Sequence, residues 1–255
     1  MPRYFIRLAY NGSNYHGWQS QQNAQSVQDE LEHCLSLKLS QAIRLSGCGR
    51  TDTGVHARMF YAHFDADTIF SKKDTAFLLD RLNAFLPSDI VVYSLFEVPP
   101  EAHARFDAVS RTYHYQITRR KDPFMLQQAF YLHGSLDVDV MQQCADALKH
   151  HTDFTSFSKL HTQTKTNNCR ISEALWLQQD DLLVFRITAD RFLRNMVRAL
   201  AGTLIGAGQG KLSVDGFNEV ILARDRSAAG YSVPAQGLFL QEVLYPGHIV
   251  KAENP

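Results

Sequence analysis

The sequence predicts an α+β protein built from two ferredoxin-like (RRM-like) pseudo-repeats, and three observations support this prediction. The first half shows strand and helix patterns in the order β-α-β-β-α-β, and the second half repeats that order more loosely. The chain has 255 residues, of which 45% are hydrophobic, enough to build a sizeable core. We expect the halves at residues 1–102 and 103–255, with their sheets joined around a central active-site cleft.

The elements of the first half follow from the spacing of its apolar residues. Ser26, followed by Asp29 at the third position, is typical of a helix N-terminus, and Pro87 is expected to end a second helix. Strands are predicted at residues 4–10, 42–46, 59–66 and 90–97, and the second helix at 74–86. The buried face of that helix is expected to hold Leu78, Leu79, Leu82 and Phe85.

The second half contains the same kinds of pattern at looser spacing. A helix is expected to begin after Asp137, and a hairpin is expected to turn at residues 179–181. The predicted strands are 109–118, 171–178, 182–189 and 238–245, and the predicted helices are 138–150, 193–206 and 213–223. Residues 151–170 form a long polar loop, and loops of this kind are usually functional or mobile.

The composition limits the possible classes of function. No apolar run approaches the ~20 residues that span a bilayer. The N-terminal residues lead directly into a strand pattern instead of a signal peptide. The four cysteines form no C-x-x-C pair, and the histidines show no metal-ligand spacing. We therefore expect a cytoplasmic protein without a metal site, in which Cys34 and Cys144 are small core residues.

Basic residues are concentrated in three segments although the net charge is zero. These segments are residues 103–121, 159–170 and 186–198, while acidic residues gather elsewhere. Such segments either form a groove that binds phosphate groups or are ordinary solvated surfaces.

The stretch SGCGRTDTGVHAR, residues 46–58, places a carboxylate on a glycine-rich turn between two predicted strands. A P-loop is excluded because no lysine follows Gly54, and a dinucleotide fingerprint is excluded because Asp52 stands where its third glycine is required. Glycines allow sharp turns, so the turn can direct Asp52 into a cleft. The alternative is an aspartate that only stabilises its own loop through an Asx-turn.

This stretch resembles the catalytic-aspartate motif of tRNA pseudouridine synthase I, the TruA family. Further landmarks occur in the family's order along nearly the whole chain, although Thr53 replaces the usual alanine after the aspartate. The landmarks are Tyr10-Asn11-Gly12, Tyr15-x-Gly17-Trp18-Gln19, Ser26-Val27-Gln28-x-Glu30-Leu31-Glu32, Asn83-x-Phe85-Leu86-Pro87-x-Asp89-Ile90, His103-Ala104-Arg105-Phe106, Arg111-x-Tyr113-x-Tyr115, Asp153-Phe154-Thr155-Ser156-Phe157, Met196-Val197-Arg198 and Gly237-Leu238-x-Leu240.

The resemblance implies a role for each of five residues. Asp52 would be the catalytic nucleophile, and Arg198 would pair with it across the cleft. Tyr113 would stack on the target uracil and remove its C5 proton. Arg50 would hold the uridine out of the stem, and Leu238 would pack against the base. Whether Asp52 attacks the sugar or the base stays open.

The resemblance also implies the pseudouridine synthase fold, an isomerase activity and a substrate. Uridines 38, 39 and 40 in the anticodon stem-loop of tRNA would be converted to pseudouridine by a homodimer, without metal, nucleotide or other cofactor. Residues 151–170 would bind RNA.

Other interpretations of the same residues remain. By pattern alone, Tyr113 is a core residue and Arg198 an arginine that extends from the edge of an apolar helix to solvent. A non-catalytic RNA-binding protein of two RRM-like units is a second hypothesis, but no RNP pattern is present. A nucleotide-dependent RNA-modifying enzyme is a third, weakened by the missing P-loop.

Overall fold

A computed structural model describes residues 1–159 and 165–250. The chain divides into two compact units, one of residues 1–109 with 240–255 and one of residues 110–239. The expected boundary between residues 102 and 103 lies inside the first unit, because that unit extends to residue 109. Among the described residues, no helix has the length and apolar character needed to cross a membrane.

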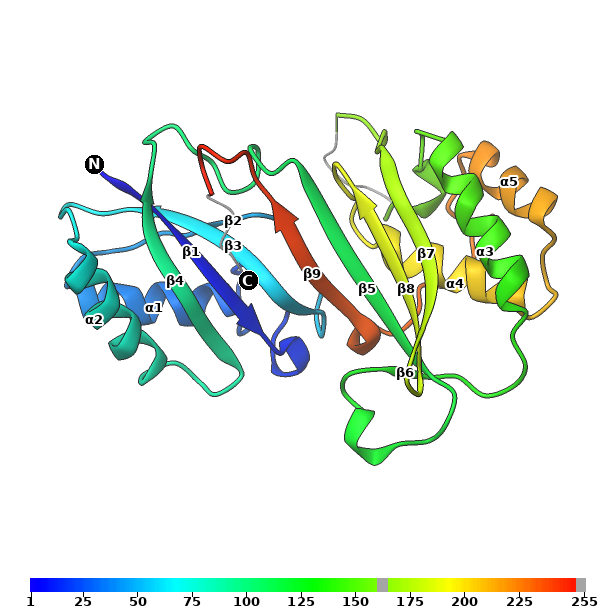
Figure 1. The fold of residues 1–255 in the computed structure, drawn as a ribbon, viewed down its shortest axis with the longest axis horizontal. Helices are drawn as coiled ribbons and strands as arrows, with labels where there is room; N and C mark the ends of the chain where they lie inside the picture. Colours follow the sequence, from blue (N-terminus) through cyan, green and yellow to red (C-terminus); the bar gives the residue numbers. More distant parts are fainter. Residues whose placement is uncertain (160–164, 251–255) are drawn as a thin grey trace. The chain divides into compact units, whose positions relative to one another are not determined.

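In the first unit, β1 pairs antiparallel with both β3 and β4, and two helices lie on one face of the sheet (Figure 1). Its strand order is β4-β1-β3-β9, and the short β2 pairs with β3. The elements are β1 (Arg3–Tyr10), η1 (Gly12–Asn14), α1 (Val27–Leu39), β2 (Ser46–Gly47), β3 (His56–Asp65), α2 (Lys72–Asn83), β4 (Ile90–Val98) and, from the end of the chain, β9 (Leu238–Leu244). The order β-α-β-β-α-β of the first half is confirmed.

Alternation along β1 explains the core of this unit. Tyr4, Ile6 and Leu8 are fully buried, because every second residue of a strand faces the same side. On the helical side, Leu31 and Leu35 of α1 are equally buried. The sheet and its helices therefore share one apolar layer.

Two local predictions for the first unit are wrong. Residues 42–45 are not a strand, and only Ser46–Gly47 pairs with β3. Phe85 is not on the buried face of α2 but is 47% exposed, with the ammonium group of Lys38 4.4 Å from its ring centroid. The cause is that α2 ends at Asn83, so Phe85 lies beyond the helical stripe.

The second unit contains a sheet in the order β5-β8-β7, with helices α3, α4 and α5 packed in the same unit (Figure 1). Its elements are β5 (Ser110–Thr118), η2 (Pro123–Met125), β6 (Phe130–Tyr131), α3 (Val138–Ala147), η3 (Leu148–His150), η4 (Thr155–Phe157), β7 (Ile171–Gln179), β8 (Leu182–Ala189), α4 (Met196–Gly208), α5 (Val214–Ala223) and η5 (Ala235–Gly237). The predicted hairpin of β7 and β8 is confirmed, with Asp180 at a φ of 51° in its turn.

Helix α4 is the buried centre of the second unit. Met196, Leu200 and Leu204 are fully buried along it, as its apolar sequence predicts. It begins three residues later than expected, because Asn195 is in the left-handed conformation with a φ of 67°. The cysteines Cys34 and Cys144 are buried in the two units, which confirms their prediction as core residues.

Candidate active site

Asp52 lies on a tight turn of the first unit, just before β3. The Val55 N–H donates to the Asp52 carbonyl oxygen at 3.1 Å, and Gly54, at the third position of the turn, has a φ of 78°. This conformation favours glycine, because a Cβ would be strained there. The structure therefore presents the half-buried Asp52 on a turn that depends on glycine.

The polar loop after β1 packs directly against this turn. The Gly54 N–H donates to the Tyr15 carbonyl at 3.3 Å. Gly17 has a φ of 90°, and a Cβ on it would lie 2.2 Å from the Thr51 carbonyl oxygen. A Cβ on Gly12 would lie 2.0 Å from the Val55 carbonyl oxygen. The glycines of this loop are thus required by its close approach to the turn on both sides of Asp52.

Asp89, just before β4, fastens the same loop to the unit. Its carboxylate accepts hydrogen bonds from the Tyr15 hydroxyl at 2.6 Å and from the Asn14 amide at 3.0 Å. Its carbonyl accepts from the Asn11 N–H at 2.8 Å. Burial, and then the hydrogen bond to Asp89, raise the pKa of the Tyr15 phenol, so this hydroxyl stays a donor at neutral pH.

Arg50 and Gly49 lie on the open side of the turn. Arg50 is exposed. No heavy atom lies within 4 Å of the position that a Cβ would take on Gly49, so the space beside this residue is open. The role of Arg50 in substrate binding stays a prediction.

The second unit holds Tyr113 and Tyr115 two residues apart on β5, which places them on the same face of the strand. Tyr113 is half-buried, and its ring meets that of Phe192 edge-to-face at 5.1 Å. Tyr115 is fully buried, and its hydroxyl donates to the Pro234 carbonyl at 2.9 Å. Burial raises the pKa of the Tyr115 phenol. The two tyrosines of one motif therefore occupy different environments.

Arg198 is bonded to the segment before β9. Its Nε donates to the Val233 carbonyl at 2.8 Å, and the Val233 N–H donates to the Arg198 carbonyl at 3.2 Å. The same segment runs close to α4, because a Cβ on Gly202 would lie 1.9 Å from the Tyr231 carbonyl oxygen. Arg198 is half-buried and held by the backbone. Its pairing with Asp52 stays a prediction.

Leu238 begins β9 next to this segment and is only 6% exposed. A Cβ on the preceding Gly237 would lie 2.8 Å from the Gln116 carbonyl oxygen on β5. The glycine therefore permits the close approach of the chain that places Leu238. Its contact with a substrate base stays a prediction.

The family model and the relatives with similar sequences point to the same family. Residues 145–246 match the family model described as tRNA pseudouridine synthase. The enzyme named tRNA pseudouridine synthase A from Parabacteroides distasonis is 51% identical over 254 residues, covering 100% of both chains. The enzyme of the same name from Porphyromonas gingivalis is 52% identical, and the match covers 98% of this chain and 99% of that protein. The one from Bacteroides thetaiotaomicron is also 52% identical, and the match covers 100% of this chain and 94% of that protein. The chain belongs to the tRNA pseudouridine synthase family.

As a member of this family, the chain is an isomerase with the mixed α+β fold of pseudouridine synthases. Thr53, which departs from the usual alanine, is exposed on the turn. The turn around Asp52 keeps its hydrogen bond from Val55 with threonine at this position.

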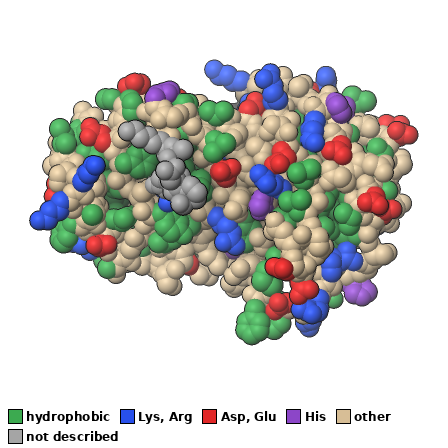
Figure 2. Space-filling model, viewed as in Figure 1, with side chains coloured by type: hydrophobic (Ala, Val, Ile, Leu, Met, Phe, Trp, Pro, Cys, Tyr) green, Lys and Arg blue, Asp and Glu red, His purple; other side chains and the backbone are tan. Residues whose placement is uncertain are grey.

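In this pseudouridine synthase, one arginine from each basic segment meets at Asp190. The Arg111 guanidinium donates to the Asp190 carbonyl at 2.9 Å, and the Asp190 carboxylate accepts from the backbone N–H groups of Arg170 at 2.8 Å and Arg191 at 2.7 Å. We call Arg111, Arg170 and Arg191, whose chain segments meet at Asp190, the basic cluster. On the face seen in Figure 2, basic and acidic side chains are interspersed.

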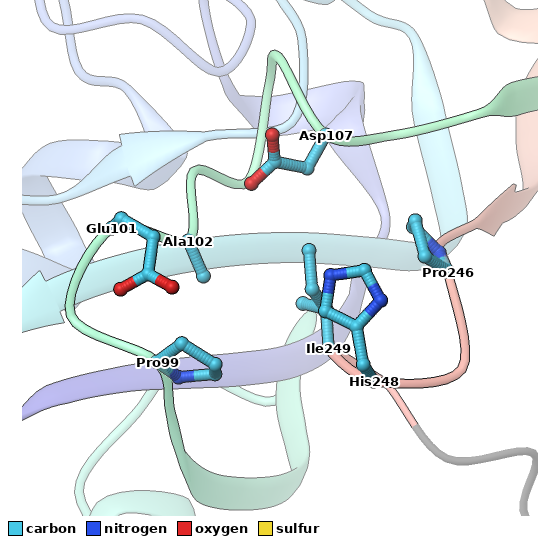
Figure 3. Close-up of a pocket in the computed structure, with 7 residues that line it drawn as sticks. All are labelled: Pro99, Glu101, Ala102, Asp107, Pro246, His248 and Ile249. Carbon is cyan, nitrogen blue, oxygen red and sulfur yellow. The ribbon is translucent and has the colours of Figure 1, made fainter.

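A cavity of about 230 Å³ in the first unit contains none of the predicted site residues. Figure 3 shows Glu101 and Asp107 on one side of it and His248 on the other. Ala102 and Ile249 also line the cavity. Across residues 1–159 and 165–250, no group of three His, Cys, Asp or Glu side chains could hold a metal ion.

The sequence did not reveal the residues that support the Asp52 turn. Tyr15, Thr51 and Asp89 all lie within motifs of the family, but their pairings join residues 33 to 74 positions apart. No spacing rule predicts such partners. The sequence also does not predict that Gly17 lies close to the turn. A glycine at this position does indicate either a positive φ or a close approach of two chain segments.

Proposed function

We propose that this chain converts uridine to pseudouridine in the anticodon stem-loop of tRNA, at positions 38, 39 and 40. The observation that carries this proposal is the match of the whole chain, at 51% identity, to an enzyme named tRNA pseudouridine synthase A. The glycine-dependent turn that presents Asp52 supports it, because this turn forms the motif to which the family assigns its catalytic aspartate.

The reaction is an isomerisation in which atoms and electrons balance. The N1–C1′ bond of uridine breaks, the uracil rotates, and a C5–C1′ bond forms. C5 then loses its proton and N1 gains one. Because nothing is oxidised, reduced or transferred to a second molecule, the stoichiometry requires no cofactor.

Each site residue has a part in this proposal. Asp52 acts as the nucleophile, at the sugar or at the base, and Arg198 pairs with its carboxylate. Tyr113 provides an aromatic surface for the uracil and takes the C5 proton. Arg50, on the open side of the turn, holds the flipped nucleotide, and Leu238 packs against the base.

The target uridine must leave its stack before C1′ can be reached, and flipping costs a few kcal/mol. Contacts with phosphate groups and stacking on an aromatic ring offset this cost. The basic cluster of Arg111, Arg170 and Arg191 is suited to the first role and Tyr113 to the second. Residues 151–170 also bind RNA in this proposal, although 160–164 lie outside the described residues. The working enzyme is a cytoplasmic homodimer whose two subunits contact one tRNA.

Release of tritium from tRNA labelled at C5 of uridine tests the activity. Wild-type protein should release tritium without added nucleotide, and Asp52→Ala should lose at least 99% of the rate while keeping its tRNA dissociation constant within about threefold. Binding energy comes from many phosphate contacts and not from one carboxylate. Asp67→Ala, an exposed aspartate of the same unit, serves as the control.

An Asp52→Ala variant that keeps more than a few per cent of the rate would refute the assignment of the nucleophile. Absence of tritium release from wild-type protein would refute the proposed activity. Sedimentation of the protein with and without tRNA tests the homodimer independently.

A further inference from the structure

We propose that Thr51 is a positioning residue for this reaction. Its hydroxyl group fixes the backbone from which the neighbouring Asp52 carboxylate is presented. The inference rests on the proposed function, because it concerns the same site. Thr51 does not need to contact the substrate, because it acts only through Asp52.

The Thr51 hydroxyl makes two hydrogen bonds. It accepts a hydrogen bond from the Trp18 N–H at 3.1 Å. It is also hydrogen-bonded to the Tyr10 hydroxyl at 2.9 Å, and either hydroxyl can be the donor. A hydroxyl has one proton and two lone pairs, so both bonds can form together. The Trp18 nitrogen also lies 3.4 Å from the Thr51 carbonyl oxygen. The main chain and the side chain of Thr51 therefore both accept hydrogen bonds from the Trp18 N–H.

Both partners belong to the rigid core of the first unit. Tyr10 is 4% exposed and Trp18 1% exposed. The Trp18 ring stacks on Phe60 of β3 with ring centroids 4.1 Å apart, and Tyr10 meets the same ring at 5.6 Å. Closely packed aromatic rings have little free space around them, so they hold the groups bonded to them in place. Thr51 is therefore tied to a fixed frame formed by β1, β3 and the loop between β1 and α1.

The turn has a second anchor on the other side of Asp52. There the Gly54 N–H donates to the Tyr15 carbonyl, and the Val55 N–H donates to the Asp52 carbonyl. Asp52 thus lies between two anchors, of which only the one at Thr51 depends on a side-chain hydroxyl. A displacement of about 1 Å at a reacting group can lower the rate about 10²-fold. Loss of the anchor at Thr51 should therefore slow the reaction.

Thr53 provides a matched comparison within the same turn. It has the same side chain, it adjoins Asp52 on the opposite side, and it is exposed. Removal of a hydroxyl at Thr51 and at Thr53 is therefore the same chemical change, and only the first removes hydrogen bonds to the core.

Single-turnover tritium release from C5-labelled tRNA tests the proposal. Thr51→Val keeps the branched shape and removes the hydroxyl, and it should lower the rate about 10- to 100-fold with the tRNA dissociation constant unchanged within twofold. Thr51→Ser restores the hydroxyl and should recover the rate to within about threefold of wild type. Thr53→Val should match wild type.

A purely structural role gives a different result. Asn83→Ala removes two hydrogen bonds of 2.8 Å that join the end of α2 to Val92, and it reports the effect of stability loss alone. If Thr51→Val slows the reaction no more than Asn83→Ala, or if serine is as slow as valine, the proposal is wrong. Should Thr51→Val not fold, Tyr10→Phe keeps the aromatic ring and removes the hydroxyl group that is hydrogen-bonded to Thr51. An unchanged rate in that variant overturns the proposal.

The result also separates this inference from the proposed function. Wild-type protein without tritium release would refute the function itself. Active wild-type protein together with an equally active Thr51→Val variant would refute the role of Thr51 alone.

Discussion

Two tyrosines of one short motif illustrate how far single residues can be predicted. The alternation in Arg111-x-Tyr113-x-Tyr115 predicts correctly that both rings share one face of β5. It does not predict that Tyr115 is fully buried with its hydroxyl bonded to Pro234, whereas Tyr113 stays half-buried against Phe192. The partner of the Tyr115 hydroxyl lies 119 residues further along the chain, so a local pattern does not reveal it.

His63 is a residue whose protonation is linked to folding. Burial, followed by the nearby charges of His103 and Arg3, lowers its pKa from 6.5 to about 4. Its Nδ1 accepts the Ala104 N–H at 3.1 Å, which requires the neutral ring. Between pH 6.5 and 4 the unfolded chain therefore binds a proton that the folded chain does not.

The stability contributed by neutral His63 is complete above pH 6.5 and is lost as the pH falls toward 4. We expect the free energy of unfolding to fall in this window by on the order of 2 kcal/mol more in wild type than in His63→Gln. Urea denaturation at several pH values measures both, with the exposed His16→Gln as control. Parallel pH profiles for wild type and His63→Gln would contradict the expectation.

At the scale of elements, local signals in the sequence located most helices, whereas strand formation that depends on a partner was not predicted. Ser26 begins α1 as predicted, with its hydroxyl accepting the Asp29 N–H. The start of α2 was missed by two residues, although Ser71 and Asp74 form a capping box there. The predicted strand at 42–46 is almost absent, because strand formation depends on a partner and not only on alternation.

The loop between β1 and α1 offers the sharpest test at this scale. Gly17→Ala should destabilise the protein by about 2–4 kcal/mol, because it combines a strained φ of 90° with a Cβ only 2.2 Å from the Thr51 carbonyl oxygen. Gly49→Ala, which meets open space, should change stability by less than about 0.5 kcal/mol. Chemical denaturation of both variants measures the difference, and equal effects would show that the close approach does not constrain the loop.

At the scale of the whole molecule, the end of the chain completes the unit with which the chain begins. The Val109 N–H donates to the Leu244 carbonyl at 2.8 Å, and the Tyr245 ring meets Phe5 at 5.5 Å and Tyr61 at 5.1 Å. The sequence predicted the last strand but placed it with residues 103–255, because a strand pattern does not show which sheet the strand joins.

Tyr245→Ala tests this assembly. We expect a loss of about 2–3 kcal/mol in stability, because aromatic contacts with β1 and β3 are removed. Amide hydrogen exchange should rise in residues 3–10 and 56–65 and change less in 171–189 of the second unit. Leu244→Ala, a neighbouring residue that is 48% exposed, is the control. An equal rise in both units would contradict the division of the chain into two units.

The return of β9 to the first unit has a consequence for biosynthesis. A ribosome releases residues 1–109 first, yet their sheet lacks one strand until residues 240–244 have emerged. Residues 110–239 form the second unit without interruption and can fold while the rest is still being made. The part of the protein that is translated first is therefore the last to be finished, and until then the nascent chain exposes an unpaired edge on which chaperones can act.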